Sequence, residues 1–231
     1  MEIDLNKKLN LIQGDCLEVL KQLPDKSIDL ILTDPPYNID FKPQRGTFEK
    51  ILNDSMQWDK FEEFMQPIMN ELYRVLKDDS IAFFFTGFSS SSAFYKYAIQ
   101  AGFTVKHKLI WVKNNFGIGY YVRPQHEEIW FCFKGKPPLP NKAISSVILA
   151  NKVNGIDLEH SCQKPIPLLE HLLKPFSKEG DLILDPFMGS GTTGEASLKN
   201  QRRFIGVELE GSYFETIKKN CSKWENQSRL F

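Results

Sequence analysis

A short apolar stretch that stops abruptly at an acidic residue constrains this chain more than any other feature. Residues 28–33 read Ile-Asp-Leu-Ile-Leu-Thr, and the next four residues are Asp34, Pro35, Pro36 and Tyr37. A nearly continuous apolar run is typical of a strand that is covered on both faces in a parallel sheet. The two prolines fix φ near about −65° and lack an N–H, so the turn is stiff and its carbonyl oxygens are left to accept hydrogen bonds. One carboxylate, one outward carbonyl and one aromatic face suggest a receptor for a planar amine.

Strand-like and helix-like segments alternate along the whole chain. Further strands are expected at 9–13, 80–86, 103–113, 129–133, 181–184 and 203–207. Helices are expected at 16–23, from Asp59 as N-cap to 76, from the serines at 89–92 to Gly102, and at 165–174, 192–200 and 211–224. This order predicts an α/β fold with a doubly wound, mostly parallel sheet. We find no repeat or linker, so residues 1–231 are expected to form a single domain.

Composition excludes several classes of protein. Lys and Arg together equal Asp and Glu at 29 each, so an anionic partner must be met by a local basic patch. The four cysteines and four histidines are scattered, which favours free thiols in a reducing cytoplasm and no metal site. The acidic start lacks a signal peptide, and no apolar run approaches the roughly 20 residues of a membrane span.

A second motif lies near the end of the chain. Gly189, Gly191 and Gly194 are spaced as GxGxxG between a strand and a helix, and Glu208 follows about twenty residues on. This combination indicates an adenosine-type cofactor. A P-loop would need a lysine after the glycines, and a nicotinamide enzyme would normally place this motif in its first strand–helix unit. S-adenosylmethionine fits better, with its carboxylate at the helix N-terminus, its ammonium at Asp185 or a backbone carbonyl, and its ribose at Glu208.

Taken together, Asp34-Pro35-Pro36-Tyr37 and the late stretch 185–193 resemble the two signature motifs of the β-class DNA amino-methyltransferases. The resemblance implies a circularly permuted, seven-stranded methyltransferase fold in which the catalytic half precedes the cofactor half. It also implies S-adenosylmethionine as the methyl donor. Asp rather than Ser before the prolines is similar to the N6-adenine members, whereas N4-cytosine members more often have Ser.

The same resemblance assigns further residues. It gives the cofactor site as Asp15, Cys16, His160, Lys164, Pro165, Asp185, Pro186, Phe187, Gly189, Gly191, Thr192, Thr193 and Glu208. It places Trp111, Lys113, Asn114, His126 and Glu127 where the family lines its target-base pocket, although polar residues at strand ends explain His126 and Glu127 equally well. Lys113 could equally be a solvated or phosphate-facing lysine.

The implied reaction is direct methyl transfer to adenine N6 at a specific site in double-stranded DNA, after the base is flipped out of the duplex. Asp34 and the Pro35 carbonyl would accept hydrogen bonds from the amino group, and Tyr37 would stack on the base. Residues 38–58 would form a closing loop, and residues 134–159 a small target-recognition segment. Phosphate contacts are expected from Lys42, Arg45, Lys50, Lys108, Arg123, Lys134 and Lys136.

Several alternatives stay open from sequence. The acceptor could be cytosine N4, RNA or a protein amide, and a DNA- or nucleotide-binding protein with a decayed site is a different class. Homodimers are common among similar proteins. A cognate restriction endonuclease is a further conceivable partner, and the sequence does not give the recognised DNA site.

Overall fold

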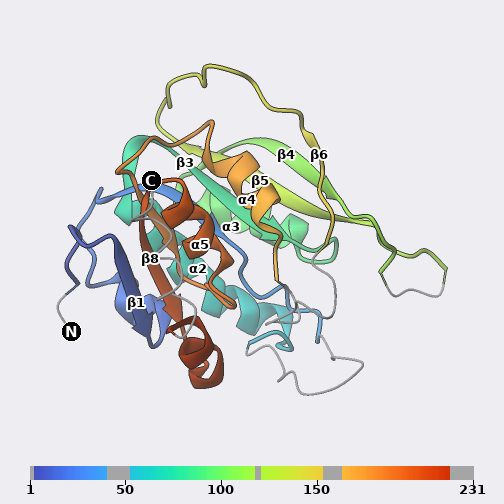
Figure 1. Ribbon diagram of the computed structural model, residues 1–231. Coiled ribbons are helices and arrows are strands. Elements are labelled where there is room, and N and C mark those ends of the chain that lie inside the picture. The colour runs from blue at the N-terminus through green and yellow to red at the C-terminus, as the bar shows by residue number, and fades with distance from the viewer. Residues whose placement is uncertain (1–2, 41–52, 118–120, 153–162, 219–231) are drawn as a thin grey trace.

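The computed structural model describes residues 3–40, 53–117, 121–152 and 163–218 (Figure 1). In this part of the chain, eight strands form one sheet in the order β1-β8-β7-β2-β3-β5-β4-β6. Every neighbouring pair is parallel except those of β5, which runs against both β3 and β4. The strands are β1 (Leu9–Gln13), β2 (Ile28–Thr33), β3 (Leu76–Thr86), β4 (Thr104–Val112), β5 (His126–Lys134), β6 (Val147–Leu149), β7 (Leu182–Asp185) and β8 (Arg203–Glu208).

Helices cover both faces of the sheet, which confirms the doubly wound α/β fold. Three of them pack in one hydrophobic core: α1 (Cys16–Leu20), α2 (Trp58–Val75) and α3 (Ser91–Ala101). The opposite core holds α4 (Ile166–Leu173), α5 (Thr192–Lys199) and a helical segment at 211–218. None of the helices within the described ranges is long and apolar enough to cross a membrane.

The apolar character of β2 follows from its place between these two cores. Ile31 points into the core of α1–α3, while Leu30 and Leu32 point into the core of α4 and α5. All three side chains are fully buried. Since burying one such side chain stabilises the fold by about 1.5–3 kcal/mol, a strand in this position cannot alternate apolar with polar residues.

Three local expectations were wrong. The sheet has eight strands rather than seven, because the described part of the 134–159 segment adds β6, a three-residue edge strand beside β4. The N-cap of α2 is Gln57, and Asp59 lies in the first helical turn. The strand expected at 80–86 already begins at Leu76, and Asp79 takes a φ of 56° inside it. The end of α3 at a left-handed Gly102 is confirmed.

The crevice for a ligand is set by the winding of the chain. The helix after β2 packs on one face of the sheet, and the helix after β7 packs on the other. These two strands are neighbours and parallel. Ligands of open α/β sheets bind beyond the carboxyl ends of the strands at such a switch point. Asp34 directly follows β2, and Asp185 is the last residue of β7.

The third glycine of the GxGxxG motif sets the distance between α5 and β8. A Cβ on Gly194 would lie 2.8 Å from Cε1 of Phe204. We expect Gly194→Ala to destabilise the protein by about 1–3 kcal/mol through overpacking, despite the better helix propensity of alanine. Urea unfolding measures this loss. In a Phe204→Leu background the same substitution should be neutral or stabilising, and an equal loss in both backgrounds would contradict the packing explanation.

Candidate active site

Three acidic residues meet at the carboxyl edge of the sheet. They are Glu208, Asp185 and Asp34, and they stand at or just beyond the ends of the adjacent strands β8, β7 and β2. The hydroxyl of Thr33 donates a hydrogen bond of 2.7 Å to Oδ1 of Asp185, across 152 residues of sequence. The early and late motifs therefore form one continuous site.

The Asp34–Tyr37 turn is held rigidly on two sides. Pro35 and Pro36 are buried, and the hydroxyl of Tyr37 donates to Oδ1 of Asp34 at 2.5 Å. Gly87, which follows β3, packs against the aromatic ring, because a Cβ at this position would lie 3.0 Å from Cδ2 of Tyr37. The ring is thus fixed at its hydroxyl and along one side.

Asp54 is a structural partner of this turn that was not selected from the sequence. Its side chain is buried, and Oδ1 accepts hydrogen bonds from the backbone N–H groups of Tyr37 at 3.0 Å and Ile39 at 3.3 Å. Asn38 makes a reciprocal pair with the backbone of Met56. Both contacts connect the turn to the residues just before α2, in a segment without periodicity.

The Asp34 carboxylate belongs to a cluster of four charged side chains, with Lys164, Glu127 and Lys113. The ammonium of Lys164 bonds to Oδ2 of Asp34 and lies 3.3 Å from Oε2 of Glu127. Lys113 pairs with Oε1 of Glu127 at 2.5 Å. Burial raises the pKa of Asp34, and Lys164 offsets only part of this effect. Burial also acts to raise the pKa of Glu127, but Lys164 and Lys113 outweigh it and lower that pKa to about 2.

The glycine turn of the late motif is tied to β8. Gly189 and Gly191 have φ values of 50° and 78°, in the left-handed region that favours glycine. The N–H of Gly189 donates to Oε2 of Glu208 at 2.9 Å, and the N–H of Glu210 donates to Oε1 at 2.8 Å. Burial raises the pKa of Glu208, which these backbone donors partly counter.

Asp185 is the most strongly perturbed carboxyl group beside this turn. Its burial raises its pKa to about 7, although hydrogen bonds with Thr33 and Thr193 act to lower it, and the charge of Asp34 raises it further. The backbone N–H of Phe187 also donates to Oδ1 of Asp185. Thr192 and Thr193 open α5, whose N-cap is Gly191. Open glycine backbone, a helix start and two carboxylates fit the carboxylate, ammonium and ribose of S-adenosylmethionine.

Other residues assigned from sequence have structural contacts of their own. Asp15 caps α1 through the N–H groups of Leu17 and Glu18. Cys16 is buried, and its pKa is raised to about 12, chiefly by that burial. Pro165 caps α4. His160 lies outside the described residues, as does most of the 38–58 loop.

The residues expected to line the base pocket divide into two groups. Trp111 is buried, and its indole N–H donates to the carbonyl of Ala150, so it packs β4 against the following segment. Asn114 accepts from the N–H of Lys152, and His126 is exposed. Lys113 and Glu127 instead reach the Asp34 cluster. Two of the five residues therefore belong to the cluster around Asp34.

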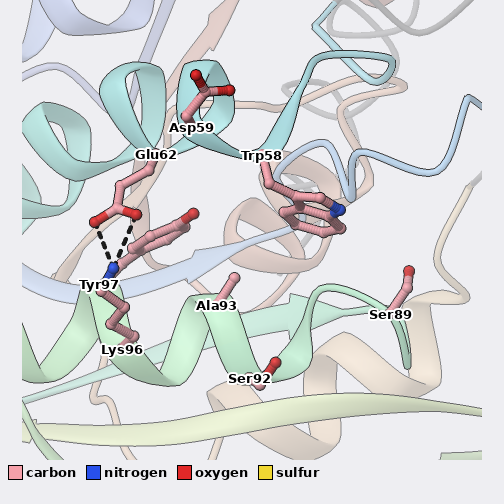
Figure 2. Close-up of a pocket in the computed structure, with 8 residues that line it drawn as sticks. All are labelled: Trp58, Asp59, Glu62, Ser89, Ser92, Ala93, Lys96 and Tyr97. Atoms are coloured by element: carbon pink, nitrogen blue, oxygen red, sulfur yellow. Dashed lines mark hydrogen bonds and ion pairs between the residues drawn. The ribbon is translucent and has the colours of Figure 1, made fainter.

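A separate shallow pocket of about 480 Å³ lies between α2 and α3 (Figure 2). Trp58 and Ser89 lie toward one end, and the ion pair of Lys96 with Glu62 lies toward the other. No residue predicted for catalysis or cofactor binding lines it. The pocket is therefore distinct from the edge where the two motifs meet.

Comparison with known protein families identifies the family of this chain. The family model described as DNA methylase matches residues 28–219, a span that holds both motifs. The chain belongs to this DNA methylase family. A putative methylase, YubD of Escherichia coli K12, is 38% identical over 87% of this chain and 85% of its own length. The DNA adenine methyltransferase YhdJ of the same strain is 26% identical over 91% of this chain and 81% of its own.

Solved structures agree with the fold of this DNA methylase. The M1.HpyAVI–SAM complex superposes with a TM-score of 0.72 at 26% identity, over 92% of this chain and 98% of that one. The PvuII DNA methyltransferase, described as cytosine-N4-specific, has a TM-score of 0.74 at 17% identity, over 96% and 93% of the two chains. The methyltransferase fold and S-adenosylmethionine, both expected from the sequence, agree with these findings.

Removal of the Asp54 carboxylate should loosen the catalytic turn of the methylase. We expect Asp54→Ala to lower kcat about tenfold or more, because two backbone N–H groups lose their acceptor and Tyr37 loses its fixed position. The affinity for S-adenosylmethionine, measured by titration calorimetry, should change little. Asp59→Ala is the control, since Asp59 is exposed in the first turn of α2. Equal effects of the two substitutions on kcat would contradict this role.

A β-branched residue in the glycine turn should impair cofactor binding. Gly189→Val is expected to weaken the affinity for S-adenosylmethionine at least about tenfold, because valine resists a positive φ and would crowd the turn. Gly180→Val provides the matched control. Gly180 has a φ of 81° and precedes β7, at the opposite edge of the sheet. The Gly180→Val variant should be less stable but keep its affinity for S-adenosylmethionine. Unchanged cofactor affinity in Gly189→Val would show that this turn is not part of the cofactor site.

Proposed function

We propose that this DNA methylase is a site-specific methyltransferase that transfers the methyl group of S-adenosylmethionine to adenine N6 in double-stranded DNA, after base flipping. The observation that carries the proposal is the placement of Asp34. Its carboxylate is oriented by Tyr37 and Lys164 and lies beside Asp185 of the cofactor motif. The name of the relative YhdJ, a DNA adenine methyltransferase, supports the choice of base.

The exocyclic amino group of adenine is a poor nucleophile, because its lone pair is delocalised into the ring. In the proposed reaction Asp34 Oδ and the backbone carbonyl of Pro35 each accept one of its N–H groups. These two hydrogen bonds favour a pyramidal nitrogen whose lone pair is aimed at the methyl group. Tyr37 provides a ring for the flipped base, and Pro36 keeps the turn stiff. Positioning and electrostatics then supply the rate enhancement.

Bound S-adenosylmethionine would supply an electrophilic methyl group on a sulfonium and would leave as the neutral thioether S-adenosylhomocysteine, while the methylated amino group would lose one N–H proton. The residues proposed to hold it are those of the late motif, with Asp185 for the ammonium, the N-terminus of α5 for the carboxylate and Glu208 for the ribose. Asp15, Cys16, His160, Lys164 and Pro165 were placed in this site by resemblance. The contacts of Lys164 with Asp34 and Glu127 favour a different role, which is argued below.

Direct transfer agrees with the state of the described cysteines. Cys16 and Cys132 are both buried. Burial raises the pKa of each thiol, to about 12 for Cys16 and still higher for Cys132. Nucleophilic catalysis by cysteine requires the thiolate, which neither residue forms readily near neutral pH. A covalent enzyme–base intermediate is therefore not part of the proposal.

The expected DNA contacts need one correction. Lys134 was expected to face phosphate, but it is buried and donates to the carbonyls of Tyr73 and Leu76. Lys108 pairs with Glu128 at 2.9 Å. The other two described residues expected to contact phosphate are Arg123 and Lys136. Both are exposed and are proposed for that contact. Lys42, Arg45 and Lys50 lie outside the described residues.

We propose residues 134–159 as the target-recognition segment, within a single methyltransferase domain spanning residues 1–231; Lys134 itself ends β5 with its side chain turned inward and takes no part in the proposed DNA contact. The described part of the 134–159 segment includes β6 and the exposed Leu139 and Leu149. A cytoplasmic location belongs to the same proposal and rests on the scattered cysteines, whereas a homodimer and a cognate restriction endonuclease rest on the sequence resemblance alone. Methylation at cytosine N4, on RNA or on a protein amide is the alternative.

Identification of the methylated product tests the proposed reaction. Plasmid DNA treated with the protein and S-adenosylmethionine should yield N6-methyladenine after digestion to nucleosides, and single-molecule sequencing should place it in one short sequence context. Asp34→Ala should reduce incorporation at least about 100-fold, because the acceptor of the amino hydrogen is lost. N4-methylcytosine as the product would refute the adenine assignment. Near wild-type incorporation by Asp34→Ala would refute the role of Asp34.

A further inference from the structure

Lys164 is a buried lysine whose contacts indicate its role. Its side chain is only 7% exposed, and the ammonium contacts the carboxylates of Asp34 and Glu127. It also lies 5.2 Å from the ring centroid of Phe85 and 5.7 Å from that of Tyr37. Burying an ammonium costs several kcal/mol unless anionic partners compensate. These contacts connect Lys164 to the candidate reacting groups rather than to the glycine turn.

Glu127 fixes this lysine to the sheet. Oε1 of Glu127 pairs with Lys113, and Oε2 faces Lys164. Lys113 immediately follows β4, and its N–H donates to the carbonyl of Gln125 just before β5. Because the two lysines lower the pKa of Glu127 to about 2, against the effect of burial, this carboxylate is ionised near neutral pH. Glu127 is therefore a negatively charged partner for both lysines near the start of β5.

Both oxygens of Asp34 have a partner that determines their direction. Oδ1 accepts from the hydroxyl of Tyr37, and Oδ2 accepts from Lys164. A carboxylate bonded through both oxygens cannot rotate freely. Each oxygen still has a second lone pair, so Asp34 can accept a further N–H hydrogen bond while it is held in this orientation.

We propose that Lys164 and Glu127 are positioning residues for the transfer reaction: Lys164 orients the Asp34 carboxylate and keeps it ionised, and Glu127 holds Lys164 in place. This inference rests on the proposed role of Asp34 as the acceptor of the amino hydrogen. It assigns Lys164 to the catalytic half of the site, in contrast to the cofactor role that the sequence resemblance implies.

The balance of charge explains why Glu127 is needed beside the lysine. Positive charge develops on the amino nitrogen as it takes up the methyl group. A buried cation next to Asp34 would oppose that change if it were uncompensated. Asp34 and Glu127 together balance Lys113 and Lys164, so the cluster has no net charge. Lys164 can thus hold Asp34 without raising the local potential against the reaction.

The pH dependence of kcat tests the roles of Lys164 and Glu127. Substitution of either residue should shift the acid limb of kcat, in opposite directions for the two residues. Asp34 must be ionised to act, so kcat falls as pH drops through its pKa. Lys164→Met removes a charge that lowers this pKa, so the acid limb should move up by about one pH unit, with a roughly tenfold loss of kcat below it. Glu127→Gln keeps an amide oxygen that can still accept a hydrogen bond from Lys164, but it removes a charge that raises the pKa of Asp34, so the limb should move down.

The readouts separate this role from a structural one. Tyr37, Glu127, Lys164 and Asp185 all face Asp34, and Asp185 has a pKa of about 7, so the wild-type limb contains more than one group. The conclusion therefore depends on the opposite directions in which the acid limb shifts in Lys164→Met and Glu127→Gln, rather than on the position of the wild-type limb. Lys164→Arg, which keeps the charge, should restore the limb. Lys134→Met is the matched control, because Lys134 is equally buried at 7% exposure but bonds to carbonyls outside the site.

Titration of each variant with S-adenosylmethionine, together with thermal unfolding, completes the test. We expect the affinity of Lys164→Met to change less than about threefold. A tenfold weaker affinity with an unshifted acid limb would overturn the proposal and return Lys164 to the cofactor site. Limb shifts in the same direction for both variants, or a shift in Lys134→Met, would overturn it as well. Nucleoside analysis of the wild-type product reports separately on the choice of base.

Discussion

The adjacent parallel placement of β2 and β7 is the constraint on which the rest of this site depends. Leu30 and Ile31 pair with Ile183 and Leu184, and just beyond this register the hydroxyl of Thr33 donates to Asp185. Because the two strands point the same way, the turn after each one emerges at the same edge of the sheet. The chain separates these motifs by some 150 residues, and only the sheet brings the Asp34 turn next to Asp185 of the glycine motif.

Burial of this edge has two opposing effects on its chemistry. Low solvent access strengthens each hydrogen bond and ion pair, but it also penalises the carboxylates that must be charged. The pKa values of Asp34, Asp185 and Glu208 are all raised, chiefly by burial, while that of Glu127 is lowered to about 2. The difference lies in the partners: Glu127 has two ammonium groups, whereas Asp185 and Glu208 have neutral donors.

Local features of the site could be predicted from sequence, and distant contacts could not. The apolar run of β2, the stiff proline turn and the left-handed glycines are each specified by a few consecutive residues. Lys164 lies 130 residues from Asp34, and Tyr37 lies 90 residues from Glu127, so their pairing depends on strand order. Asp54 and β6 were missed because neither stands in a periodic pattern. Lys134 was misassigned because its neighbours in sequence do not reveal that its side chain turns inward.

The strand order also separates the chemistry from the proposed recognition of DNA. From β2, the order runs through β3, β5 and β4 before it reaches β6 at the edge. In the described part of this segment, three residues of β6 pair with β4, at the edge of the sheet farthest from β1. Lys113 and Glu127 belong to the β4–β5 hairpin and face the catalytic turn, so this hairpin is the part of the fold that connects the two regions. The proposed division places Asp34 and its partners beside the central strands and the proposed recognition segment at the edge of the sheet, where β6 is held by β4 and by the burial of Ile148.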